Sequence, residues 1–264
     1  MAPARVVIAG GGFAALEAAL AVRALADDRA ELALISPAPV LAYRPAAPTE
    51  AFREEPGLEF ELPQIAADLG ATYWASAVEA VAPEQRTVQL ESGTQLEYDV
   101  LVLAVGAEAT ATIPGALIFR DQRDVARLRA LLAQVAAGEV RRLVFVVPSH
   151  QSWSLPAYEL ALLSAGQAAD HSVDPEIAVV TPEATPLAVF GPGSSQAVAS
   201  LLHERHIRFI GGVLPHSVQP DGSLALQFEA PIAADRVVAL PDLRGHGGSQ
   251  SQRGKTCHRQ SLAR

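Results

Sequence analysis

The sequence predicts an α/β protein made of two successive units in which strands alternate with helices. A strand near the N-terminus breaks at a glycine cluster and restarts as a helix, and a second alternation begins near Asp124. Half of the 264 residues are hydrophobic and only 5% are aromatic, which is typical of a folded α/β protein rather than of a disordered chain. A chain of this length accommodates one large domain or two of medium size.

The first strand and helix form the most informative stretch. Val6–Ala9 is an apolar run that predicts a buried strand, and the chain breaks at Gly10 before a helix begins. The helical spacing predicts an inward face made of Leu16, Leu20 and Ala24.

Gly10, Gly12 and Ala15 have the G-x-G-x-x-A spacing of the dinucleotide-binding (Rossmann) fingerprint. The first glycine allows the tight turn, the second lets a pyrophosphate approach the backbone, and the alanine lets helix and strand pack closely. The helix N-terminus favours the negative charge of the phosphates. The predicted dinucleotide-binding residues of this turn are Gly10, Gly11, Gly12, Phe13, Ala14 and Ala15. The alternative is a purely structural glycine-rich turn.

The second strand is predicted over Glu31–Ser36 and ends before Pro37. A Rossmann unit usually carries Asp or Glu at this strand end to bind a ribose. Ser36 offers a hydroxyl but no carboxylate, which disfavours NAD at this site. In the following loop, Arg44 is either a phosphate or carbonyl ligand or a solvated loop residue.

Residues 46–70 are predicted to form a peripheral excursion. Short strands are predicted to follow within Thr72–Ala82, Arg86–Leu90 and Gln95–Glu97. The apolar run Tyr98–Ala107 predicts a central parallel strand. It ends at Gly106, next to a ligand crevice, because parallel sheets bind ligands at the carboxyl ends of their strands.

The second unit starts with an amphipathic helix over Asp124–Ala136, which Gly138 is placed to end. Its predicted buried face consists of Val125, Leu128, Leu131, Leu132 and Val135. Ser194 is expected to cap a later helix that runs to His206, with Val198, Leu201 and Leu202 facing inward. Further strands are predicted over Arg142–Val147, Glu176–Thr181, Ile207–Val213, Leu224–Phe228 and Arg236–Leu240, with a hairpin turn at Asp221-Gly222.

The segments GGGFAALEAAL, YRP and YDVLVLAVGA resemble those of flavoproteins with two dinucleotide-binding domains. The resemblance is to the pyridine nucleotide-disulfide oxidoreductase-like family, in the branch of type II NADH dehydrogenases and sulfide:quinone reductases, and covers roughly residues 5–243. It implies two Rossmann-like (FAD/NAD(P)-binding) units, the second inserted into the first, and FAD as cofactor. The implied divisions are an FAD unit over 1–108, a second unit over 109–243 and a tail over 244–264.

The resemblance also implies site residues. Gly10, Gly12 and Ala15 would line the FAD pyrophosphate, and Arg44 and Pro45 would lie near it. Ala104 and Gly106 would lie beside the isoalloxazine ring, although Ala104-Val105-Gly106 stands where the family has Ala-Thr-Gly. This branch tolerates the loss of the acidic residue, so Ser36 remains a candidate contact. The sequence identifies no catalytic side chain.

The second unit lacks a glycine fingerprint, because no glycine lies between Val147 and Ala157. Side chains there would keep a pyrophosphate from the backbone, which disfavours NAD(P)H as a ligand. His150, Trp153 and Tyr158 in and beside this loop either shape an electron-acceptor pocket or, for Trp153, pack into the core.

Charge and composition limit the partners. The net charge is −9, while residues 244–264 carry five Lys/Arg and no acid, so the acidic body disfavours nucleic acid as a partner. No apolar run is long enough to span a membrane and no signal peptide is evident, which predicts a cytoplasmic protein. A peripheral membrane contact and a homodimer are both compatible with the sequence. The polar tail is expected to be disordered and to replace the return segment of the family, as in a C-terminally truncated chain.

Two function classes follow. The first is an FAD-dependent oxidoreductase that passes electrons from a reduced small-molecule donor to a quinone-like or other acceptor. The alternative is a non-catalytic or remnant nucleotide-binding protein of the same fold, crippled by loss of the second FAD motif. Cys257 is the single cysteine, so the chain lacks a redox-active cysteine pair. No metal is expected, since His203 and His206 have no third ligand in view.

Overall fold

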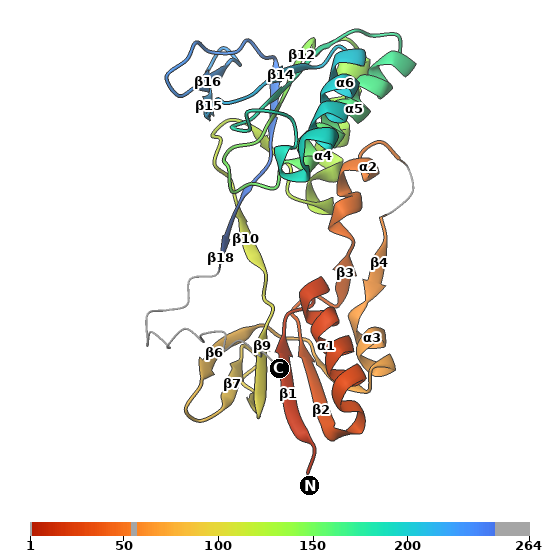
Figure 1. The fold of residues 1–264 in the computed structure, drawn as a ribbon, viewed down its shortest axis with the longest axis vertical. Helices are drawn as coiled ribbons and strands as arrows, with labels where there is room; N and C mark the ends of the chain where they lie inside the picture. The colour runs from red at the N-terminus through yellow and green to blue at the C-terminus, as the bar shows by residue number, and fades with distance from the viewer. Residues whose placement is uncertain (1, 54–56, 246–264) are drawn as a thin grey trace.

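A computed structural model of the chain describes residues 2–53 and 57–245. These residues form two lobes, with β1, α1 and β9 in the lower lobe of Figure 1 and α4, α5 and β12 in the upper lobe. Each lobe is built on its own parallel sheet. No helix among the described residues is long and apolar enough to cross a membrane.

The first sheet has four parallel strands in the order β5-β2-β1-β9. They are β1 (Ala4–Ala9), β2 (Ala30–Ile35), β5 (Ala71–Trp74) and β9 (Val100–Leu103). The strand predicted within Tyr98–Ala107 is β9, and its expected central position was wrong. Among the described strands β9 pairs only with β1, so it lies at the edge of the sheet. Val100 and Leu103 are accordingly 49% and 60% exposed.

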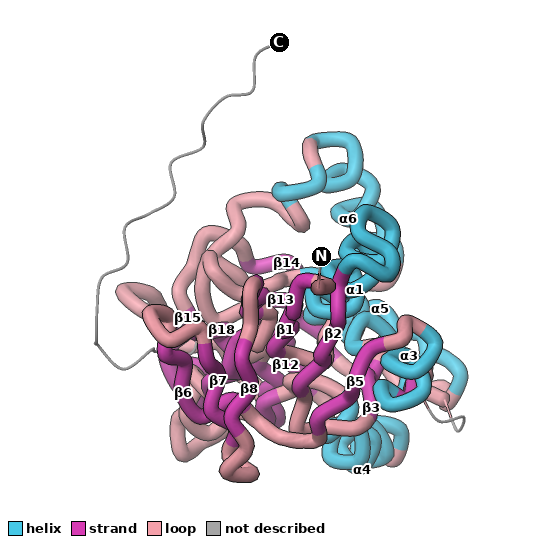
Figure 2. Tube along the Cα trace, turned by 90° about the horizontal axis from the view of Figure 1, so that it is seen from below, coloured by secondary structure: helices cyan, strands magenta, loops and turns pink. Residues whose placement is uncertain are grey.

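Helices cover one face of this sheet and a small antiparallel sheet covers the other. The helices are α1 (Phe13–Ala26) and α3 (Leu62–Asp68), with a 3₁₀ turn over Asp27–Arg29. The antiparallel sheet consists of β6 (Val78–Ala82), β7 (Thr87–Leu90) and β8 (Gln95–Glu97). Seen from below in Figure 2, the helices gather on one side and β6–β8 on the other.

The predicted inward face of α1 was wrong in part. Leu20 is 51% exposed and Ala24 is also exposed, whereas Ala15 and Ala19 are buried. Small side chains face the sheet because the glycine-rich turn brings the helix axis close to β1.

The excursion after β2 reaches the second lobe instead of remaining peripheral. It contains β3 (Val40–Ala42), a 3₁₀ turn over Arg44–Ala46, α2 (Ala47–Glu50) and β4 (Glu59–Glu61). Ala47 and Ala51 are 2% exposed and belong to the hydrophobic core of the second lobe. The guanidinium of Arg129 donates to the carbonyl oxygens of Glu50 and Arg53, at 2.7 Å each.

The second sheet is also parallel, in the order β11-β17-β12-β13-β14. Its strands are β11 (Leu117–Ile118), β12 (Arg142–Val146), β13 (Glu176–Val180), β14 (Arg208–Ile210) and β17 (Arg236–Ala239). The helices α4 (Val125–Ala136), α5 (Leu155–Asp170) and α6 (Pro192–Glu204) pack through one hydrophobic core. The hairpin of β15 (Pro215–Val218) and β16 (Leu224–Leu226) contributes to the other. Short 3₁₀ turns span Gln122–Asp124 and Ala188–Phe190.

The predicted face of α4 is confirmed, since its buried residues are Val125, Leu128, Leu131, Leu132 and Val135. The prediction for α6 was wrong at two places. Gly191 rather than Ser194 is the N-cap residue, and Leu201 is 45% exposed while Leu202 is buried.

An antiparallel ribbon connects the two lobes. It pairs β10 (Ala107–Thr110) with β18 (Asp242–Gly245), as Figure 1 shows. Arg244 and Gly245 were expected to begin a disordered tail, but they pair with Glu108 and Ala107. The rest of the expected tail, 246–264 with Cys257, lies outside the described residues.

Candidate functional site

The candidate dinucleotide site lies where the chain order of the first sheet reverses, between β1 and β9. From β1 the chain continues outward through β2 and β5 on one side, and β9 is added on the other. In open α/β sheets, ligands bind at this switch point, at the carboxyl ends of the strands. Gly10 ends β1 there, and its N–H donates to the carbonyl of Ile35 at 2.8 Å.

Gly10 has a structural reason to be glycine. Its φ is +136°, and a Cβ atom at this position would overlap the carbonyl oxygen of Ala104. The backbone after β9 therefore contacts the turn directly, and the N–H of Ala104 donates to the carbonyl of Ala9 at 2.8 Å. This contact brings Ala104 and Gly10, two of the predicted site residues, together.

Gly11 packs closely against Ser36, the residue that follows the second strand. A Cβ atom on Gly11 would lie 2.5 Å from both the Oγ of Ser36 and a methyl carbon of Leu62. Ser36 is 4% exposed, and its hydroxyl donates to the carbonyl of Ala38 at 2.9 Å. The Ser36 Oγ thus reaches the glycine-rich turn and retains capacity to accept a hydrogen bond.

The hydroxyl of Tyr73 fixes the turn that carries Ser36. It donates to the carbonyl oxygens of Ser36 at 2.9 Å and Ala38 at 3.0 Å. Burial raises the pKa of this phenol, with the hydrogen bond to Ser36 acting in the opposite direction. Nothing in the sequence marks Tyr73 as a site residue, because its partners are backbone atoms 35 and 37 residues away.

Gly12 differs from the two preceding glycines. It is the N-cap residue of α1, and no atom lies within 4 Å of the place that its Cβ would occupy. No side chain caps this helix end, so the N–H groups of its first turn are available to an anion. Ala15 is 0% exposed beneath the turn, whereas Phe13 and Ala14 are exposed.

The loop with Tyr43, Arg44 and Pro45 flanks this helix end. The rings of Phe13 and Tyr43 meet edge to face, with their centroids 5.8 Å apart. Arg44 and Pro45 are both exposed. The charge of Arg44 also acts on Asp121 in the second lobe. Burial raises the pKa of Asp121, but hydrogen bonds with Arg123 outweigh burial and lower this pKa, and the charge of Arg44 makes a smaller contribution in the same direction.

Gly106 follows β9, with a φ of +76° and open space around its Cβ position. It precedes β10, the first strand of the ribbon between the lobes. The site therefore combines backbone N–H groups, one serine oxygen and two glycines, Gly12 and Gly106, with open space at their Cβ positions. Such a set suits the phosphates and the ribose of a dinucleotide, and it contains no acid, base or nucleophile.

In the second sheet, the corresponding switch point lies between the carboxyl ends of β12 and β17, and side chains of the protein bond one another there. The loop after β12 supplies Ser149 and Ser152, and both hydroxyls donate to the carboxylate of Asp242 after β17. The Ser149 contact is 2.6 Å long. These bonds lie where the fingerprint loop of a nucleotide-binding unit would receive a pyrophosphate.

Glu183, just beyond β13, is a polar residue that the sequence analysis missed. Its carboxylate accepts hydrogen bonds from the hydroxyls of Tyr158 at 2.7 Å and Ser154 at 3.1 Å. Burial, followed by the bond to Glu183, raises the pKa of Tyr158 well above its ordinary value. An acidic residue shortly after the end of a parallel strand was the signal available in the sequence.

The three residues of the suggested acceptor cluster differ in their exposure. Trp153 is 51% exposed and meets Phe190 edge to face at 5.6 Å, so it does not pack as core. Tyr158 is 1% exposed and lies in the hydrophobic core, whereas His150 is exposed.

The family model described as "Pyridine nucleotide-disulphide oxidoreductase" matches residues 4–240. A sulfide-quinone reductase of Aquifex aeolicus (strain VF5) is 26% identical over 234 residues, which are 82% of this chain and 52% of that protein. The solved structure of the sulfide:quinone oxidoreductase from Aquifex aeolicus has a TM-score of 0.81 at 23% identity, with 92% of this chain and 59% of that chain covered.

A second curated relative is the ferredoxin–NAD(+) reductase component of an anthranilate 1,2-dioxygenase system from Burkholderia cepacia. It is 29% identical over 249 residues, which are 88% of this chain and 57% of that protein. The chain thus spans about half the length of the curated relatives that it matches.

Proposed function

This chain belongs to the pyridine nucleotide-disulphide oxidoreductase family, and from that premise we propose that it is an FAD-dependent oxidoreductase. FAD would be held by the first lobe, at the switch point between β1 and β9. The protein would pass electrons from a reduced donor to a quinone-like or other acceptor. Relatives named as a sulfide-quinone reductase and a ferredoxin–NAD(+) reductase support electron transfer as the general activity.

The observation that carries the proposal is the contrast between neighbouring glycines. The Cβ positions of Gly10 and Gly11 are blocked by protein atoms, whereas that of Gly12 faces open space at an uncapped helix N-terminus. Protein packing therefore explains glycine at the first two positions but not at the third. The approach of a ligand phosphate to the backbone explains why residue 12 is a glycine.

The residues of the chain would have distinct roles toward FAD. The N–H groups at the start of α1 would bind the pyrophosphate, and the Oγ of Ser36 would accept a hydrogen bond from a ribose hydroxyl. Arg44 and Pro45 would flank the pyrophosphate, and Ala104 and Gly106 would lie on the isoalloxazine side. When bound, FAD supplies the hydride and electron chemistry, while the protein supplies binding, orientation and electrostatics.

The second lobe favours a donor other than a nicotinamide nucleotide. Ser149 and Ser152 bond Asp242 at the switch point of the second sheet, and the carboxylate of Glu183 is already bound to Tyr158 and Ser154. A nucleotide would have to break these hydrogen bonds before it could use the same groups. One relative is named as a sulfide-quinone reductase and another as a ferredoxin–NAD(+) reductase. The hydrogen bonds described above favour chemistry of the first kind, which does not use NAD.

The alternative function is a nucleotide-binding protein without catalysis. It is favoured by one observation, namely that the candidate site described above contains no general acid, base or nucleophile. Both functions require the first lobe to bind FAD, so they differ only in whether the bound flavin exchanges electrons.

The test is a titration of the full chain with FAD, followed by anaerobic addition of sulfide, NADH and NADPH in separate samples. We expect the chain to bind added FAD weakly in the titration, a non-nicotinamide donor to bleach the bound flavin, and a short-chain quinone to restore its absorbance. A protein that does not bind FAD at all contradicts the proposal. Flavin that remains oxidised with every donor supports the non-catalytic alternative.

A further inference from the structure

Two aromatic rings stand half exposed on the second lobe. Trp153 lies in the loop after β12, and Phe190 ends the 3₁₀ turn after β13. Their rings meet edge to face with centroids 5.6 Å apart, but Trp153 is 51% exposed and Phe190 is 48% exposed. Val189, next to Phe190 in the chain, is 70% exposed. Large apolar side chains that gather on a surface in this way mark a ligand or partner site.

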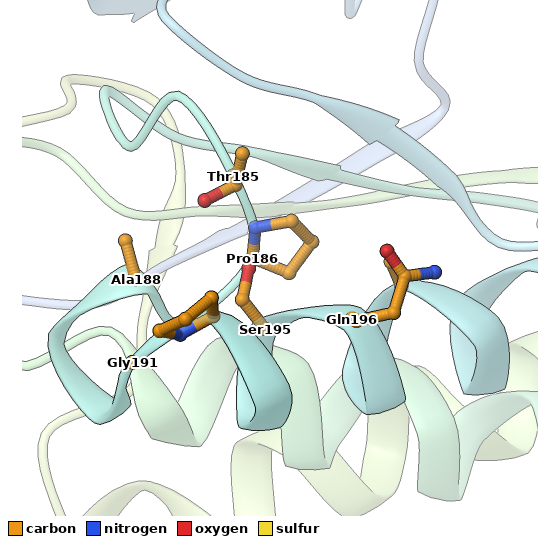
Figure 3. A pocket seen from close by; sticks show the side chains of 8 residues that line it. Thr185, Pro186, Ala188, Gly191, Ser195 and Gln196 are labelled. Carbon is orange, nitrogen blue, oxygen red and sulfur yellow. The ribbon is translucent and has the colours of Figure 1, made fainter.

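This aromatic pair is distinct from the pocket of about 400 Å³ between the loop after β13 and the start of α6. Figure 3 shows the residues that line the pocket. Ala188 and Gly191 are among them, but Val189 and Phe190, which lie between these two in the chain, are not. The ring of Phe190 meets Trp153 instead. The pair therefore forms a surface of its own.

A tight turn just before Trp153 is fixed to the ribbon between the lobes. The N–H of Ser152 donates to the carbonyl of Ser149 at 3.3 Å. The hydroxyls of both serines donate to the carboxylate of Asp242, the first residue of β18. His150, inside this turn, is exposed, and an imidazole can donate a hydrogen bond to a ligand. The anchored turn thus carries a hydrogen-bond donor and is followed directly by an exposed aromatic ring.

The aromatic pair lies at the edge of the second sheet that faces the first lobe. The strands β12, β13 and β17 are parallel, so the loops after them share one edge of the sheet. From this edge β17 leads directly into β18, and in the first lobe β9 leads into β10. Since β10 and β18 pair as the ribbon between the lobes, the carboxyl ends of the two sheets face each other along it (Figure 1). A ligand on the aromatic pair would therefore lie on the side of the second lobe that faces the dinucleotide site.

From this arrangement we propose that Trp153 and Phe190 bind the ring of a quinone, the acceptor class of the proposed function on which this inference rests. A quinone ring is flat, apolar and uncharged, so it stacks on exposed aromatic rings. The imidazole of His150 donates a hydrogen bond to one quinone carbonyl oxygen. The surface suits a single ring better than a protein partner. The two half-exposed rings offer about 200 Å², whereas a stable protein interface covers about 800 Å² on each partner.

Tryptophan fluorescence tests the proposal, because Trp74 and Trp153 are the two tryptophans of the chain. In a full-length Trp74→Phe protein, before FAD is added, Trp153 is the single emitter. We expect a ubiquinone with one isoprenoid unit to quench its emission saturably. The Trp153→Phe protein retains Trp74, which lies in β5 of the first lobe. It serves as the control and should show only the linear quenching of random collisions.

Two substitutions and a matched control, all in the Trp74→Phe protein, make the test specific. Phe190→Ala should raise the Kd of the quinone about tenfold, as expected for one lost aromatic contact. His150→Ala should raise it about fivefold through the lost hydrogen bond. Phe228→Ala, at a ring of the second lobe that is 96% exposed, should leave the Kd unchanged. Linear quenching of Trp153, or the same Kd for Phe190→Ala and Phe228→Ala, overturns the proposal.

The fluorescence result is independent of the flavin test of the proposed function. Saturable quenching of Trp153 supports the quinone site even where every donor leaves the flavin oxidised. Linear quenching of Trp153 in a protein whose reduced flavin is reoxidised by the same quinone places the acceptor elsewhere. In that case the site is wrong and the proposed function stands.

Discussion

At the residue scale, the glycine-rich turn contains glycines that serve different purposes. Gly10 has a positive φ and touches the backbone of Ala104, so any side chain there conflicts with the fold. Gly12 has a β-region φ of −91° and open space beside it, so the fold itself tolerates a side chain. Mutation of each residue should therefore affect a different property.

We expect Gly12→Val to lose FAD binding while the far-UV circular dichroism and the urea midpoint stay close to wild type. The branched side chain would stand where phosphate oxygens approach the N–H groups. Gly10→Ala, the matched comparison, should lower the urea midpoint with or without FAD. Retention of flavin by Gly12→Val at wild-type stoichiometry would show that the site is assigned to the wrong residues.

Asp124 is a buried carboxylate, 2% exposed, which accepts hydrogen bonds from the backbone and guanidinium of Arg120 at 2.8–3.0 Å. Burial opposes ionisation, but the bonds with Arg120 prevail and lower the pKa of Asp124. A lowered folded-state pKa stabilises the protein above the unfolded value of about 3.9, and this contribution is lost as the pH falls further.

The free energy of unfolding should therefore fall on acidification below about pH 4 more steeply in wild type than in Asp124→Asn. At neutral pH the variant should be less stable by about 2 kcal/mol, since a hydrogen-bonded charged acceptor is lost. Urea denaturation at several pH values measures both effects. Parallel pH profiles for the two proteins would contradict this role of Asp124.

At the scale of elements, the loop from β12 to α5 distinguishes the second lobe from a nucleotide-binding unit. Its serines bind Asp242, and the first turns of α5 carry Tyr158 toward Glu183. These bonds connect the loop to the strand ends on either side of it, so a dinucleotide would compete with the protein's own groups.

We therefore expect NADH and NADPH to reduce the bound flavin slowly and without saturation at micromolar concentration. Stopped-flow absorbance under anaerobic conditions measures the rate. Fast, saturable reduction by either nucleotide would mean that the loop opens and that Ser149, Ser152 and Asp242 do not exclude it.

At the scale of the whole molecule, the first sheet has an exposed edge. Among the described strands, β9 has a neighbour only in β1, and Val100, Leu103 and Val105 are 48–60% exposed. An apolar strand edge of this kind favours pairing with another chain. The chain as described should therefore associate in a concentration-dependent way.

Leu103→Lys should reduce this association, because a lysine on an edge strand opposes strand addition. Light scattering and sedimentation over a range of concentrations measure the effect. Leu25→Lys, at a residue that is 78% exposed on α1, is the matched control and should change little. Equal association of all three proteins would place the contact elsewhere.

The main strands and helices of both units, and the buried face of α4, could be predicted from local patterns of residues. The five buried residues of α4 follow from their helical spacing, and the turn of Gly10 to Ala15 follows from the small residues within one strand and helix. Such features depend on side chains a few residues apart, whose relative positions are set by local backbone geometry. The assignment of FAD to this turn remains a prediction that the titration above tests.

Contacts between residues far apart in the sequence could not be predicted from local patterns and are seen only in the folded protein. Ser149 and Asp242 are 93 residues apart in sequence, Ala47 and Ala51 join the core of the other lobe, and the apolar run of β9 lies at an edge. Periodicity reports that a segment is apolar but not which segment covers it, because strand pairing depends on distant residues. For the same reason α1 buries Ala19 rather than Leu20, since the close approach of helix and sheet favours the smaller side chain.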